Sequence, residues 1–214
     1  MTTRVYNQNC PIARGLDVIG ERWTLLIVRE LIGGPRRYSD LRAELPGIAT
    51  NLLAQRLKEL QESGLIDRTD LPAPIGRTVY TLTDEAWQRV LPIVQAIALF
   101  GLDKIDPQDA SAITPLNGFL AGMLLSFDAA AATELDTSYR IDIDGRRFEL
   151  AVTNGHLAST RGEPDVTVTA SAADLITIRL GTHPNARKSA LRRIRFDGDP
   201  HAVDAMRNVF SLRL

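Results

Sequence analysis

Residues 47–64, GIATNLLAQRLKELQESG, decide how the N-terminal half of the chain folds. Leu53, Leu57 and Leu60 recur at the i, i+4, i+7 spacing of one helical face, and Gly64 can end the helix in the left-handed conformation. The opposite face is polar and carries, in chain order, Thr50, Asn51, Ala54, Gln55 and Lys58, with Arg56 to one side. Amide and hydroxyl side chains can bind base edges in a major groove, and cations can bind phosphates. The stretch predicts an amphipathic helix, either an ordinary surface helix or one that contacts DNA.

The segments before this helix are also predicted to be helical. Pro11 suits the first turn of a helix, and apolar residues follow it at helical spacing. Residues 23–32, WTLLIVRELI, are too apolar and too long for a solitary strand, so we expect a buried helix that ends at residues 33–35. Ser39 is predicted to cap a short helix that ends at residues 45–47.

A hairpin and a further helix are predicted after Gly64. Residues 65–69 and 78–82 alternate like two strands, and the segment between them is rich in turn-forming residues. Helix, short helix, helix and hairpin is the element order of a winged helix-turn-helix. Thr83 is predicted to cap one continuous helix, residues 83–102, and one side of that helix is too apolar to remain bare.

Sequence motifs in this half are similar to those of the HxlR-type transcriptional regulators. The matching segments lie in order between about residues 9 and 102: CPI at 10–12, LDVIG at 16–20, WTLLI at 23–27, GPRRY at 34–38, LPGI at 45–48, QRLKEL at 55–60 and YTLT at 80–83. The resemblance implies a DNA-binding homodimer whose seam is built from the start of the chain and from residues 83–102. Ala49-Thr50 departs from the family pattern of a capping Ser followed by Pro, so we expect Thr50 to cap the helix instead.

Site residues follow from the helix face and from the resemblance. We expect three side chains to contact bases: Thr50, Asn51 and Gln55. Phosphate or minor-groove contacts are assigned to Arg36, Arg37, Ser39, Arg56, Lys58 and Arg77, the last standing near the expected tip of the wing. The dimer seam is assigned to Ile12, Leu16, Trp87, Leu91, Val94 and Ala98.

The second half of the chain predicts an α+β domain. Residues 105–111 are polar and broken by proline, as in a linker, and residues 115–132 predict a helix. Strand-like runs follow between 139 and 170, with a hairpin signal at Asp144-Gly145, and we expect them to form a meander. Ser171 and Asp199 are predicted to begin two further helices.

This order of elements resembles the sterol carrier protein type 2-like fold over about residues 112–214. The matching segments include FELAV at 148–152, GEPDVTVT at 162–169 and FDGD at 196–199. The resemblance implies a curved sheet and helices around an apolar tunnel for lipids or acyl chains, although a closed apolar core satisfies the pattern equally well. The residues expected to line it are Phe119, Met123, Leu124, Phe127, Phe148, Leu150, Met206 and Phe210.

Composition limits the remaining classes of protein. The chain has 214 residues and is 44% hydrophobic, but no run approaches the about 18 uncharged apolar residues of a membrane span. One cysteine and three scattered histidines give no disulfide and no metal site, and no catalytic constellation or cofactor motif is present. We expect a cytoplasmic protein that is neither an enzyme nor membrane-bound. Because the net charge is −1, any DNA-binding charge must be concentrated on one face.

Two features keep alternative interpretations open. Cys10 precedes the helix that begins at Pro11, where the helix dipole favours a reactive thiolate, and several HxlR-type proteins sense oxidants or electrophiles through a cysteine at this position. Cys10 is therefore either a redox sensor or an inert thiol at the dimer seam. The basic cluster Arg187-Lys188, Arg192-Arg193 and Arg195 is either a solvated surface or a contact for DNA or an anionic head group.

The sequence thus predicts a two-domain α/β protein. Residues 1–104 are expected to form a winged helix-turn-helix for DNA binding and dimerisation, 105–111 a linker, and 112–214 a ligand-binding α+β domain with a mostly antiparallel sheet. The expected function is that of a dimeric, sequence-specific regulator of transcription, modulated by an apolar small molecule. The alternatives are a thiol-sensing regulator that acts through Cys10 and a lipid or acyl carrier whose N-terminal domain mainly dimerises.

Overall fold

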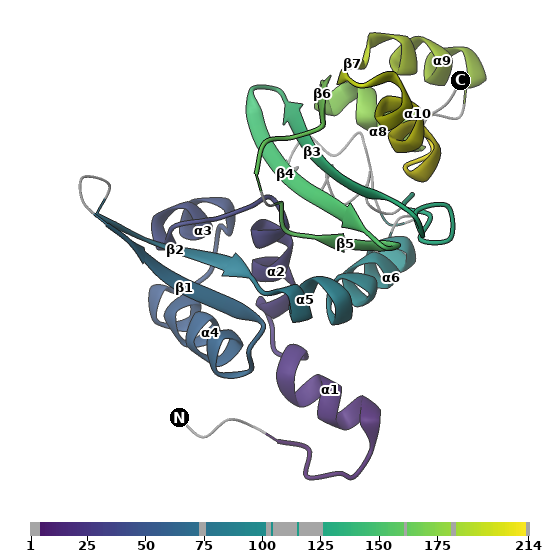
Figure 1. Cartoon of the computed structure of the whole chain (residues 1–214). Coiled ribbons are helices and arrows are strands. Elements are labelled where there is room, and N and C mark those ends of the chain that lie inside the picture. Colours follow the sequence, from purple (N-terminus) through teal and green to yellow (C-terminus); the bar gives the residue numbers. More distant parts are fainter. Residues whose placement is uncertain are drawn as a thin grey trace. The chain divides into compact units, whose positions relative to one another are not determined.

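The computed structural model describes residues 5–72, 76–101, 104, 115, 126–160, 162–180 and 183–212. The chain forms two compact units, Met1–Ala86 and Trp87–Leu214, and each is described by itself (Figure 1). The domain limits at residues 104 and 112 stay a prediction. None of the helices in the described ranges is long and apolar enough to span a membrane.

The first unit is a winged helix-turn-helix, as predicted. Its helices are α1 (Pro11–Ile19), α2 (Thr24–Ile32), α3 (Tyr38–Glu44) and α4 (Thr50–Glu62). The antiparallel strands β1 (Ile66–Leu71) and β2 (Arg77–Leu82) form the wing, and reciprocal backbone hydrogen bonds between Arg36 and Tyr80 add a bridge to β2. This bridge fixes the chain entering α3 against the wing.

The core of this unit is built by one apolar face from each helix. Side chains with at most 2% of their surface exposed include Ile27, Val28, Leu31 and Ile32 of α2, Leu41 of α3, and Leu53, Leu57 and Leu60 of α4. Burying each such side chain contributes about 1.5–3 kcal/mol. The leucine spacing in residues 47–64 therefore predicted the buried side of α4 correctly.

Two helix boundaries differ from the prediction. The short helix α3 begins one residue earlier than Ser39, because the Asp40 carboxylate accepts the backbone N–H of Arg37 at 3.0 Å and stabilises that turn. Ala49, and not Thr50, occupies the cap position of α4, and Thr50 is its first helical residue.

The helix predicted for residues 83–102 is two helices, α5 (Asp84–Arg89) and α6 (Leu91–Gly101). Thr83 caps the first, since its hydroxyl accepts the N–H of Ala86 at 3.2 Å. The break falls at Val90, two residues before Pro92, which has no N–H to continue the helical ladder.

The second unit contains a five-stranded sheet with the order β5-β4-β3-β6-β7. Its strands are β3 (Asp136–Ile143), β4 (Arg146–Thr153), β5 (His156–Ala158), β6 (Val166–Ala170) and β7 (Arg195–Gly198). The β3–β4, β4–β5 and β6–β7 pairs are antiparallel, so the sheet is mostly antiparallel as expected. The predicted meander is wrong for β6, which crosses over to pair in parallel with the far edge of β3.

One turn and one close approach of two strands in this sheet require positive φ angles, which few residue types adopt. Asp144 and Gly145 both have positive φ, as the hairpin signal predicted. Gly198 has a φ of +146°, and a Cβ added there would lie 2.3 Å from the carbonyl oxygen of Asp165. Glycine at 198 therefore permits β7 to approach the start of β6.

One face of the sheet forms the core of the second unit. Alternate residues of β3, β4 and β6 are buried in register, for example Ile141 opposite Phe148 and beside Val168. The ring of Phe210, which follows α10 (Pro200–Val209), lies 6.0 Å from the ring of Tyr139 and so covers this face. The carboxylate of Asp199 caps α10 by accepting two backbone N–H groups, as predicted.

Two further differences from the prediction lie in the second unit, and one predicted helix cap there is confirmed. The described part of the helix predicted for residues 115–132, from 126 onward, consists of turns, and most of the remainder lies outside the described residues. Ser171 caps α8 (Ala172–Leu180) as expected, since its hydroxyl accepts the N–H of Asp174. The helix α9 (Pro184–Arg193) and the strand β7 were not predicted, because charged residues dominate both segments.

Candidate nucleic-acid interface

The polar face of α4 is exposed at its N-terminal end. Thr50, Asn51, Ala54 and Lys58 are exposed and Gln55 is half-buried, while the leucines behind them are buried. The phenol of Tyr38 donates a hydrogen bond of 2.7 Å to the carbonyl oxygen of Thr50 and joins the start of α4 to α3. A rigid helix end with short polar side chains on its outer face suits insertion into a groove.

Gln55 and Lys58 each have an intrahelical partner. The Gln55 amide donates to Glu59 Oε1 at 2.9 Å, and the Lys58 ammonium lies 3.6 Å from Glu62. The Lys58 pair is exposed, so it is weak and can exchange for a phosphate. The Gln55 hydrogen bond orients the amide along the helix surface.

Arg56 differs from the expectation that it contacts phosphates. Its guanidinium is buried, with 10% of the side chain exposed, and it pairs with Glu21 at 2.9 Å and with Glu59. The helix phase turns this residue inward, toward the loop before α2. Arg56 therefore fixes α4 from behind, and we remove it from the phosphate-contacting set.

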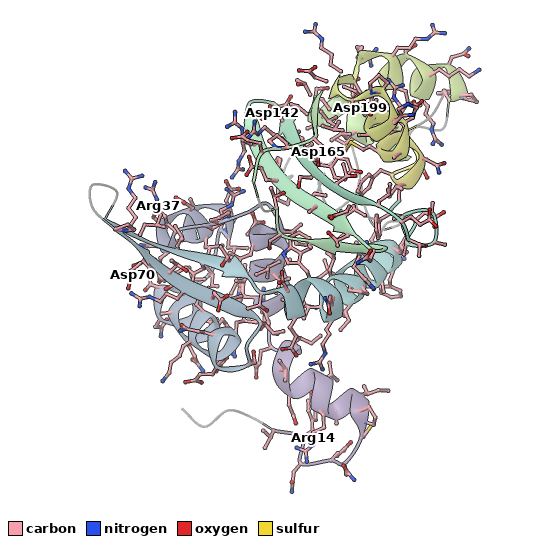
Figure 2. The ribbon with its side chains drawn as sticks, viewed as in Figure 1. Arg14, Arg37, Asp70, Asp142, Asp165 and Asp199 are labelled. Atoms are coloured by element: carbon pink, nitrogen blue, oxygen red, sulfur yellow. The ribbon has the colours of Figure 1, made fainter. Side chains whose placement is uncertain are left out.

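The remaining cations lie at the start of α3 and on the wing. Figure 2 shows Arg37 at the start of α3 and Asp70 on β1. Arg77 is exposed at the beginning of β2, opposite Leu71, and it forms no ion pair with a described residue. Arg36 is half-buried and its guanidinium donates to the carbonyl oxygen of Gly33 at 3.4 Å, while Ser39 is exposed. Arg37, Ser39 and Arg77 are thus accessible to a polyanion.

The residues assigned to the dimer seam separate into two groups. Ile12 and Leu16 on α1 are 74% and 41% exposed. Trp87, Leu91 and Val94 are instead buried within the single chain, so these three assignments are wrong for a partner-facing surface, and Ala98 is half-buried. The break at Val90 changes the helix phase, which brings a different apolar set outward: Ile93, Ile97, Leu99 and Phe100.

The expected ligand-lining residues that the structure describes belong to the core of the second unit. Phe148, Leu150, Met206 and Phe210 are at most 1% exposed, and the ring of half-buried Phe127 lies 5.6 Å from that of Phe210. Phe119, Met123 and Leu124 lie outside the described residues. Sequence reasoning missed Tyr139, whose buried hydroxyl has no hydrogen-bond partner among the described residues, and burial raises the pKa of this phenol.

Three aspartates of the second unit have structural partners. Asp165 accepts the N–H of Ser138 at 2.7 Å and so orders the turn before β6. Asp142 lies 3.7 Å from Arg147, and Asp144 accepts the N–H of Ala172 at the start of α8. Cys10 is half-buried at the cap position of α1, and its side chain makes no capping hydrogen bond. Among the described residues no group of three His, Cys, Asp or Glu side chains could hold a metal ion.

A helix pair, an exposed polar helix and a hairpin wing define the class of winged helix-turn-helix DNA-binding proteins. The HxlR-like helix-turn-helix family matches residues 18–109, and the SCP-2 sterol transfer family matches residues 102–211, about half of the chain. The chain belongs to the HxlR-type helix-turn-helix transcriptional regulators, and its C-terminal half is a member of the SCP-2 sterol transfer family.

Two curated relatives come from Bacillus subtilis. The HTH-type transcriptional regulator YvaP is 34% identical over 102 residues, which is 47% of this chain and 94% of that protein. The HTH-type transcriptional regulator YodB is 36% identical over 95 residues, or 43% of this chain and 85% of that protein. A solved structure of reduced YodB covers 48% of this chain at 29% identity, with a TM-score of 0.40.

Proposed function

We propose that this regulator is a homodimer that recognises a specific DNA sequence by placing α4 of each protomer in a major groove. The exposed polar face of α4, backed by buried leucines, carries this proposal. The half-sites then lie about one helical turn, about 10 bp, or a multiple of it apart. Thr50, Asn51 and Gln55 contact bases, and the phosphate contacts come from Arg36, Arg37, Ser39, Lys58 and Arg77.

Exposed apolar faces on α1 and α6 support the dimer. Ile12 and Leu16 are one turn apart on α1, and Ile93, Ile97 and Phe100 follow the i, i+4, i+7 spacing on α6, where Phe100 is 81% exposed. An exposed apolar stripe along a helix, as found on each of these two helices, is rare on a soluble monomer and typical of an interface.

A paired set of variants tests the DNA-binding proposal. Gln55→Ala removes a base contact worth about 1–3 kcal/mol, so it should lower affinity for the preferred sequence by about 10-fold (about 1.4 kcal/mol) or more and relax specificity. Arg77→Ala removes a phosphate contact, so it should weaken binding to all sequences alike and reduce the salt slope by about 1.

Anisotropy titrations against DNA upstream of the protein's own coding region, at several salt concentrations and with competitor DNA, measure both effects. If both variants bind like the wild type, α4 and the wing are not the DNA-binding surface. Absence of any salt-dependent binding by the wild type would favour the alternative of a lipid or acyl carrier.

We further propose that an apolar, lipid-like molecule bound in the C-terminal half modulates DNA binding. Membership of the SCP-2 sterol transfer family supports this. A ligand changes DNA affinity only by the difference between its affinities for the two dimer geometries. A fluorescent fatty-acyl probe that neither binds the full chain nor changes its operator affinity would contradict the proposal. In the thiol-sensing alternative, Cys10→Ser would abolish the response to oxidants and leave DNA binding intact.

A further inference from the structure

The helix α9 (Pro184–Arg193) carries several cations that pair with no carboxylate of a described residue. Arg187, Lys188 and Arg192 are exposed on it, and Arg195 is exposed just beyond its end. None of the four forms an ion pair with a described residue, and the helix contains no acidic residue. By contrast, three arginines elsewhere in this unit, Arg140, Arg147 and Arg207, each pair with a carboxylate.

The helix that presents these cations is held firmly. Its own residues Ala190 and Leu191 are buried, and α9 packs against α8 (Figure 1). The guanidinium of Arg193 donates two hydrogen bonds to one oxygen of Asp174, one of them 2.8 Å long from Nε. Arg193 thus joins the two helices, while the other cations face solvent on a fixed scaffold.

The chemistry of this surface fits phosphates of a nucleic acid better than a lipid surface. A helix that binds in a membrane interface inserts large exposed apolar side chains, but the one large apolar side chain of α9, Leu191, is buried. No large hydrophobic side chain is exposed in the described part of residues 126–212. Arginine, which outnumbers lysine here by three to one, matches phosphate geometry with its planar fork.

We propose that α9 and Arg195 bind the DNA backbone and add a sequence-independent contact to that made by the helix-turn-helix. This inference rests on the proposed function, because the helix-turn-helix brings the DNA to the same molecule. Once one site is bound, the second meets its phosphates at a high effective concentration, so weak contacts become significant. The net charge of −1 means that the effect comes from this surface and not from the chain as a whole.

The test uses two full-length triple variants with the same change in net charge. R187Q/K188Q/R192Q removes the unpaired cations of α9, and R140Q/R147Q/R207Q removes paired cations of the same unit. Each phosphate contact contributes about 0.9 to the slope of log K against log salt. The first variant should therefore reduce the magnitude of that slope by about 2–3 and leave sequence preference unchanged. The control should keep the wild-type slope. Thermal unfolding by circular dichroism verifies that both variants fold.

The outcomes separate this inference from the proposed function. An α9 variant with the wild-type slope, or a control with an equal loss, overturns the role of α9 even though the wild type binds DNA. A wild type without salt-dependent DNA binding contradicts the proposed function itself. Binding of the wild type to phosphatidylglycerol vesicles that is lost in the α9 variant, with DNA binding unchanged, would assign the surface to lipid head groups and overturn the inference.

Discussion

Asp174 shows how one buried carboxylate can hold two helices together. It accepts hydrogen bonds from Arg193 and from the hydroxyl of Ser171, and the arginine lowers the pKa of Asp174 below its usual range, against an opposing effect of burial. A lowered pKa in the folded state means that folding favours the ionised form. The stabilisation is therefore complete above the ordinary aspartate pKa of about 3.9 and is lost as the pH falls through the lowered value.

At the residue scale we predict that Asp174→Asn destabilises the second unit by about 1 kcal/mol at neutral pH. The effect is modest because the Arg193 side chain is 58% exposed and solvent weakens the pair. Melting temperatures of the wild type and the variant should differ at about pH 7 and converge as the pH falls below the ordinary aspartate pKa of about 3.9. A difference that stays constant over this range would show that the charge of Asp174 contributes nothing.

At the element scale, the position of α4 depends on groups behind it. Arg56 connects the helix to Glu21 across 35 residues of sequence, and Tyr38 secures its first turn. A helix that contacts bases needs its side chains placed to within about 0.5 Å, so such supporting contacts matter as much as the contacting residues. The structure thereby assigns Arg56 a positioning role.

We expect Arg56→Met to lower both stability and DNA affinity. The substitution leaves Glu21 and Glu59 without their partner, which should cost about 1–2 kcal/mol since both carboxylates are partly exposed. All DNA sequences should be bound more weakly because α4 is misplaced. Lys58→Ala is the control: it should leave the melting temperature unchanged, while the loss of one phosphate contact weakens binding and reduces the salt slope by about 1. Equal melting temperatures for Arg56→Met and the wild type would refute the positioning role.

At the scale of the whole molecule, we expect two chains to associate through the exposed apolar residues Ile93, Ile97 and Phe100 of α6. We predict that Ile97→Glu, or Phe100→Glu, converts the dimer to a monomer and reduces operator affinity by 100-fold or more, since a dimer bound to two half-sites loses one of them. Sedimentation equilibrium measures the assembly. Asn208→Glu, an exposed position on α10, is the matched control and should remain dimeric. A monomeric wild type, or a dimeric Phe100→Glu and Ile97→Glu, would contradict the prediction.

Local spacing accounts for the features that were predicted correctly. The leucines of α4, the caps at Thr83, Ser171 and Asp199, and the turn at Asp144-Gly145 all depend on residues within about four positions of one another. The family motifs then identified the winged helix-turn-helix. Phe148, Leu150, Met206 and Phe210 of the expected ligand-lining set are buried core residues, and Phe119, Met123 and Leu124 lie outside the described residues.

The sequence alone therefore determined the four helices and the hairpin of the first unit, the apolar face of α4, and the β3–β4 hairpin with α8 and α10 in the second unit. Tertiary structure alone decided that Arg56 points inward to Glu21, that β6 pairs in parallel with β3, and that Trp87, Leu91 and Val94 are buried. It also left Arg187, Lys188 and Arg192 of α9 without an ion pair among the described residues, while Arg193 pairs with Asp174. The physical reason is range: periodicity records contacts within one element, whereas ion pairs and strand order depend on groups distant in the chain.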